Sequence, residues 1–155
     1  MGLSHSRSVL VFAVLAMCAA VAAHAQDTAV RTVDNPYQQE FDYALGETLA
    51  PNVEIEGLRW TSMRVAPRDE GQIDPGDDAV DIELTVVLDN RGTDNARLQM
   101  VVLLEDGAGQ PLDRLTLESI RVRDGRTEEV VERFKAPGAS LLAVEKVYLF
   151  LELER

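Results

Sequence analysis

The chain has 155 residues, of which 27 are Asp or Glu and 15 are Lys or Arg, so its formal net charge at pH 7 is −12. A chain this acidic is not expected to bind nucleic acid or anionic lipid, because both are held by basic patches. It is long enough to build one hydrophobic core of its own.

Residues 1–25 have the three parts of a secretory signal peptide. Arg7 precedes a long apolar run, and residues 23–25 form an Ala-His-Ala cleavage motif. The run is shorter than the roughly 20 residues that a membrane-spanning helix needs. Met17 is a bulky residue directly before Cys18, which argues against a lipidated cysteine. We therefore expect this segment to be cleaved, with no membrane span afterwards and a periplasmic or secreted location.

Cleavage would change the chemistry that is available to the mature chain. It would remove His5, His24 and Cys18, which are the only histidines and the only cysteine. The net charge would become −13, because Arg7 is the one charged residue lost. Disulfides, Ser-His-Asp triads and Cys-His dyads are then excluded, and the usual zinc, copper and iron sites lack their ligands.

What remains for catalysis is carboxylate chemistry, since the chain also has no glycine-rich phosphate loop. We expect a protein that is not an enzyme and has no cofactor, and we keep an acid-dependent hydrolase only as a contrasting class. An acidic mature chain favours cations or a basic partner instead.

Residues 26–51 are expected to form an N-terminal lead ahead of the main domain at residues 52–155. The lead is predicted to carry a short helix, with Asn35 as its N-cap and Pro36 in its first turn. Apolar side chains recur there at a spacing of four residues: Phe41, Leu45 and Leu49.

From residue 52 onward the apolar pattern has the period of two that is typical of strands. It shifts phase at Gly57, between Ile55 and Leu58, which predicts a β-bulge. Residues 80–89 are the clearest strand, and their core-facing side chains are Val80, Ile82, Leu84, Val86 and Leu88.

Later strands follow at short intervals, each separated by turn residues. Residues 96–106 place four side chains on one face: Leu98, Met100, Val102 and Leu104. Residues 114–123 predict a strand that is kinked near Ser119. A turn at Asp124-Gly125 leads into residues 127–136, which fit either a strand or a helical turn. The last strand faces the core with Val147, Leu149, Leu151 and Leu153.

Together these patterns predict an all-β sandwich of about seven antiparallel strands in one domain, with a small barrel as the alternative. Residues 81–137 carry a series of turn and strand marks: Asn90, Gly92, Glu105-Asp106, Gly109, Gly125 and Phe134. In this order they resemble the FxLYD-type immunoglobulin-like domains of exported bacterial proteins, although "LLED" stands where Leu-Tyr-Asp would be. The resemblance implies an immunoglobulin/fibronectin-III-like sandwich in the cell envelope, with no catalytic residues to carry over.

The stretch "DEGQIDPGDDAVDIE" at residues 69–83 is the densest acidic cluster. Calcium takes six to eight oxygen ligands, often from a loop rich in Asp. Four carboxylates are the calcium candidates: Asp74, Asp77, Asp78 and Asp81. Their spacing does not fit an EF-hand, and Pro75-Gly76 is ordinary turn chemistry. We interpret the stretch as a solvated loop, with a calcium-stabilised adhesion or surface module as the alternative function.

Some strands are apolar on both faces, although the outer face of an antiparallel sheet is usually polar. The side chains opposite the core stripes are Val87, Val101, Leu103, Tyr148 and Phe150. We expect the lead to cover them, or a partner to bind them, unless the register is misjudged. The strand at residues 146–153 should be paired on both sides or covered, with Tyr148 and Phe150 largely buried.

The leading hypothesis for function is therefore an exported, non-catalytic module that acts by protein–protein contact in the bacterial cell envelope. Its partner would be another envelope protein or a second copy of the chain. The candidate partner-binding residues are Val87, Val101, Leu103, Tyr148 and Phe150.

Overall fold

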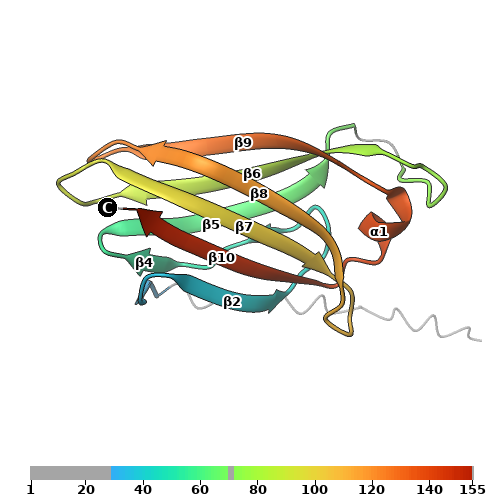
Figure 1. The fold of residues 1–155 in the computed structure, drawn as a ribbon, viewed down its shortest axis with the longest axis horizontal. Helices are drawn as coiled ribbons and strands as arrows, with labels where there is room; N and C mark the ends of the chain where they lie inside the picture. The colour runs from blue at the N-terminus through green and yellow to red at the C-terminus, as the bar shows by residue number, and fades with distance from the viewer. Residues whose placement is uncertain (1–28, 70–71, 155) are drawn as a thin grey trace, which may run out of the picture.

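The computed structural model describes residues 29–69 and 72–154, which form two β-sheets packed face to face (Figure 1). The signal segment expected at residues 1–25 lies outside the described residues. In the described part, no helix is long and apolar enough to span a membrane. The all-β sandwich is confirmed, and the sheets remain separate rather than closing into a barrel.

The larger sheet, sheet A, has the order β1-β4-β5-β6-β9, and β3 pairs in addition with β5. Its strands are β1 (Arg31–Thr32), β3 (Thr48–Leu49), β4 (Val53–Ile55), β5 (Leu58–Pro67), β6 (Val80–Asn90) and β9 (Thr127–Ala136). Sheet B has the order β2-β10-β7-β8. Its strands are β2 (Tyr37–Asp42), β7 (Ala96–Glu105), β8 (Pro111–Val122) and β10 (Lys146–Glu154).

The described residues thus contain ten strands rather than about seven, and β1 pairs with β4 in parallel. The additional strands are short or come from the lead, where the apolar pattern is weak. A short helix, α1 (Gly138–Leu142), lies in the connection from β9 to β10 at one end of the sandwich (Figure 1). The sequence there predicts only a break at Pro137-Gly138.

The core lies between the two sheets, as the alternating patterns predict. Ile82, Leu84, Val86 and Leu88 of β6 are fully buried. The same is true of Leu98, Met100, Val102 and Leu104 in β7 and of Val147, Leu149 and Leu151 in β10. Successive side chains of a strand point to opposite faces, so a period of two places every second residue in the core.

The predicted helix in the lead is wrong, because residues 37–42 form β2 instead. β2 pairs with β10 in an antiparallel register that runs from Asp42 opposite Lys146 to Tyr37 opposite Leu151. Without β2, the backbone groups along this edge of an apolar strand would have no partner. Pairing across 100 residues of chain therefore outweighs the local helical spacing, and the lead belongs to the sandwich.

The bulge expected at Gly57 is also wrong, because the phase shift there is a two-residue hairpin turn. Ile55 pairs with Leu58 across it. Glu56 has a φ of 50° and Gly57 a φ of 85°, and a type I′ turn needs positive values at both positions. A register shift occurs later in β5, between Trp60 and Ser62, in the pairing of β5 with β6.

Other expectations for the second half of the chain are confirmed. Ser119 has a φ of 56° and lies at a register shift in β8, which is the predicted kink. Gly125 has a φ of 60° in the predicted turn, and residues 127–136 are a strand. β10 pairs with β2 on one side and β7 on the other.

Candidate functional site

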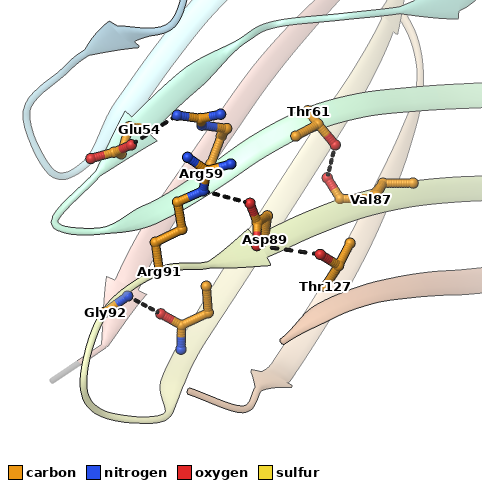
Figure 2. A network of polar contacts seen from close by, with 9 residues as sticks. Glu54, Arg59, Thr61, Val87, Asp89, Arg91, Gly92 and Thr127 are labelled. Atoms are coloured by element: carbon orange, nitrogen blue, oxygen red, sulfur yellow. Dashed lines mark hydrogen bonds and ion pairs between the residues drawn. The ribbon is translucent and has the colours of Figure 1, made fainter. Parts of the chain in front are cut away.

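The outer face of sheet A is polar and held by ion pairs. Figure 2 shows one end of it, where Glu54 pairs with Arg59 at 3.5 Å and Arg91 donates to Asp89 at 2.7 Å. The Arg91 guanidinium lowers the pKa of Asp89, to which the Thr127 hydroxyl also donates at 3.3 Å. Positive and negative side chains neutralise one another here, so this face is a solvated surface.

The same kind of pairing continues along sheet A. Arg133 lies 3.1 Å from Glu83, and Lys135 lies 3.4 Å from Asp81. Asp81 is one of the four calcium candidates, so its carboxylate already has a cationic partner within the chain.

The acidic loop is organised by turn contacts. Asp74 Oδ1 accepts a hydrogen bond from the Gly76 N–H at 2.7 Å, and the Asp77 N–H donates to the Asp74 carbonyl at 3.0 Å. The Asp77 carbonyl accepts from the Gly138 N–H at 2.8 Å, which joins the loop to the start of α1. A Cβ on Gly138 would collide with the Asp74 carbonyl oxygen, so only glycine permits this approach.

The four calcium candidates do not form one site in this arrangement. All four residues are exposed. Within residues 29–69 and 72–154, no group of three or more His, Cys, Asp or Glu side chains is placed to hold a metal ion. Asp74 accepts a hydrogen bond from a turn N–H, and Asp81 pairs with Lys135. These contacts within the chain explain the positions of both carboxylates without a metal ion.

The outer face of sheet B is different, because four apolar side chains meet at its centre. Tyr148 lies opposite Leu103, and Phe150 lies opposite Val101, in the pairing of β10 with β7. Each of the four is half-buried. We call Val101, Leu103, Tyr148 and Phe150 the apolar patch.

Val87, the fifth candidate, lies apart from this patch. It is on the outer face of sheet A, opposite Ser62 and Glu129. Its carbonyl accepts a hydrogen bond from the Thr61 hydroxyl at 3.1 Å (Figure 2). The five candidates are therefore divided between the two outer faces of the sandwich.

The lead does not cover the apolar patch, so the expected intramolecular cover is wrong. β2 lies beside β10 in the sheet, and its apolar side chains point inward. Phe41, Leu45 and Leu49 pack against the core cluster. Tyr148 and Phe150 are nonetheless half-buried, and the Tyr148 hydroxyl donates to Gln38 at 2.6 Å along the rim.

The rim of the patch is divided by charge. Strand register places the outward side chains in rows across the sheet. One row runs Glu40, Tyr148, Leu103, Arg114, and the next runs Gln38, Phe150, Val101, Thr116. A row near the end of the strands runs Glu154, Arg97, Arg121.

Most outward acidic groups thus lie along β2 and β10, and most outward basic groups lie along β7 and β8. The exceptions are Lys146 on β10, Glu105 on β7 and Glu118 at the β8 bulge. Arg97, Arg114 and Arg121 are exposed, and none of them forms an ion pair within the described residues. Cationic groups are therefore available beside the apolar patch.

Lys146 and Glu105 lie at one end of the apolar patch, where they are neighbours across β10 and β7. Lys146 Nζ lies 2.9 Å from Glu40 Oε1, and this hydrogen bond raises the pKa of Lys146. Glu105 is only 8% exposed, and burial raises its pKa. Its Oε2 has no hydrogen-bond partner in the described part of the chain.

Sequence reasoning found the apolar side chains of sheet B but not the charge division around them. The sequence does hint at this charge division, because Arg114 and Glu40 both occupy outward positions of alternating stretches. Their relation became visible only with the strand order, which places β2 and β8 at opposite edges of one sheet.

No protein-family model matches this chain, and a search of the curated proteins finds no similar sequence.

Proposed function

We propose that the chain is an exported, non-catalytic β-sandwich module that works by protein–protein contact in the bacterial cell envelope, through the outer face of sheet B. The observation that carries the proposal is the contrast between the two faces. Sheet A has ion pairs across its strands, whereas sheet B has an apolar patch with charged groups at its edges.

An apolar centre with a polar rim is the usual anatomy of a protein interface. Tyr148 and Phe150 are the aromatic members of the patch, and aromatic side chains supply much of the binding energy where they are desolvated. Each is flanked by Leu103 or Val101, so a partner would meet a continuous apolar surface.

The remaining parts of the proposal rest on the sequence. The signal-peptide layout of residues 1–25 supports export. A mature chain without His or Cys supports a role other than catalysis. The order of turns in residues 81–137, together with the two-sheet fold, supports an FxLYD-like, immunoglobulin-type domain.

Affinity capture from a periplasmic extract tests this function when two variants are compared. Phe150→Ser removes an aromatic side chain from the patch, and Val131→Ser removes an apolar side chain that is 44% exposed on the other sheet. We expect Phe150→Ser to lose the captured protein about tenfold or more, because interface aromatics are frequent hot spots. Val131→Ser should capture as much as the unmodified chain.

Both variants must first melt as the unmodified protein does, within a few degrees. The proposed surface would be contradicted if the two folded variants captured equal amounts of protein. It would also be contradicted if Val131→Ser abolished capture and Phe150→Ser did not.

A further inference from the structure

We propose that the partner of this face is a second copy of the same chain, docked sheet B to sheet B about a two-fold axis parallel to the strands. This inference rests on the proposed function, because it uses the same surface, and it adds the identity of the partner and the orientation. The order of side chains across sheet B is self-complementary.

A two-fold axis along the strands exchanges the edges of sheet B. β2 of one copy then faces β8 of the other, and β10 faces β7, because the strand order is β2-β10-β7-β8. Each row of side chains therefore faces the same row of the second copy, with its order from edge to edge reversed. Face-to-face sheets pack in this aligned way, with a rotation of about 30° between their strands.

Reversal of the central row brings complementary groups together. Glu40 faces Arg114 of the second copy, and Tyr148 faces its Leu103. In the next row Phe150 faces the second copy's Val101. By symmetry every such contact occurs twice, as in other isologous interfaces.

The outer rows follow the same rule. Lys146 shares a row with Glu105, so reversal places it over Glu105 of the second copy. Glu154 shares a row with Arg97, so these two groups also meet across the interface. Arg97 and Arg114, which have no ion pair within the described residues, would both gain an acidic neighbour.

Charge also decides between the possible orientations. A two-fold axis across the strands would place β2 over β2 and β8 over β8, so the edge that carries Glu40 would meet itself, and so would the edge that carries Arg114. Like charges placed opposite each other disfavour an interface. Only the axis parallel to the strands pairs the acidic edge with the basic edge.

The size of the face limits the strength of the dimer. Four strands about 4.8 Å apart, over about eight residues at about 3.4 Å each, give a face of roughly 500 Å². Stable interfaces bury about 800 Å² per partner, so this one lies at the weak end. The net charge of −12 on each chain also opposes association. We expect a reversible dimer with a Kd on the order of micromolar.

Sedimentation velocity on purified protein, expressed from its full sequence, tests the dimer at concentrations up to about 100 μM, well above a micromolar Kd. Arg114→Glu and Glu40→Arg should each weaken self-association about tenfold or more, because each places like charges together twice. An equimolar mixture of the two variants should regain the dimer, because each variant then offers the charge that the other lacks. Arg133→Glu, on the outer face of sheet A, is the control and should dimerise normally.

Phe150→Ser provides a second route if either charge variant fails to fold, since it should also yield a folded monomer. A chain that stays monomeric at about 100 μM, a concentration well above the expected Kd, would overturn the inference. If capture from extract still depended on Phe150, the proposed function would stand with a different envelope protein as partner. A mixture of folded Arg114→Glu and Glu40→Arg variants that stays monomeric, while the unmodified chain dimerises, would overturn the proposed orientation.

Discussion

Tyr43 is a polar side chain held inside an apolar core, with only 5% of its surface exposed. Its hydroxyl accepts a hydrogen bond from the Val65 N–H at 2.7 Å and donates to the Glu47 carbonyl at 3.0 Å. The side chain thereby ties the segment before β3 to β5. Val65 lies 22 residues further along the chain, so the local sequence around Tyr43 does not reveal this contact.

Tyr43→Phe should lower the free energy of unfolding by about 1–3 kcal/mol, because the buried Val65 N–H loses its acceptor. Urea denaturation measures this. Tyr148→Phe is the matched control: it removes a hydroxyl that bonds to Gln38 on the exposed rim, so a change within about 0.5 kcal/mol is expected. Equal losses in the two variants would show that the Tyr43 hydrogen bonds do not matter.

Because the Tyr43 hydroxyl is buried, we expect the stability of the fold to depend on pH at high pH. Burial raises the pKa of Tyr43 from 10.0 to about 12, so the folded protein keeps a proton that the unfolded chain releases near pH 10. The resulting stability is complete below pH 10 and is lost as pH rises toward 12. Between these values, stability should fall more steeply in the unmodified protein than in Tyr43→Phe, and parallel curves would contradict the assignment.

At the scale of elements, the β4–β5 hairpin shows how a turn can imitate another feature in sequence. A bulge and a two-residue turn both shift the phase of an alternating pattern by one residue. The pairing of Ile55 with Leu58 identifies the turn. Close contact of Gly57 with Gly92 then joins this hairpin to the loop after β6.

Gly57→Ala should destabilise the fold more than Gly46→Ala does, by at least about 1 kcal/mol in chemical denaturation. Both glycines have a φ near 85–88°, so both variants carry the cost of a left-handed alanine. Only at Gly57 would the new Cβ lie 3.2 Å from the Gly92 nitrogen, whereas nothing lies within 4 Å at Gly46. Equal losses would mean that the loop moves aside freely.

At the scale of the whole molecule, charge is arranged differently on the two outer faces. Sheet A carries several ion pairs across its strands, whereas Arg97, Arg114 and Arg121 of sheet B form no ion pair within the described residues. The acidic loop at residues 72–81 is joined to the start of α1, because the Gly138 N–H donates to the Asp77 carbonyl at 2.8 Å.

Thermal melting with millimolar calcium and with a chelator is expected to give the same Tm. A calcium site that was 100-fold above its Kd would stabilise the fold by roughly 2.7 kcal/mol, which is a shift of several degrees. Asp74→Asn and Asp78→Asn should likewise leave any calcium response unchanged. A calcium-dependent rise in Tm that these variants abolish would restore the alternative of a calcium-stabilised surface module.

Three stripes were predictable from sequence: residues 80–88, 98–104 and 147–153. A strand that buries one face must alternate, so the pattern within a segment reports its own orientation. The kink at Ser119 and the turn at Asp124-Gly125 were also predictable from local sequence. At such positions the backbone geometry selects particular residue types.

Only the tertiary structure decided which segments became neighbours. β2 was hidden because its partner, β10, lies about 100 residues away and supplies the hydrogen bonds that make it a strand. Val87 was grouped with Phe150 because both point outward, yet they lie on different sheets. Alternation states that a side chain faces outward, but strand order and register determine what stands beside it. The proposed dimer face consists of such neighbours, so it could not be recognised before the sheets were assembled.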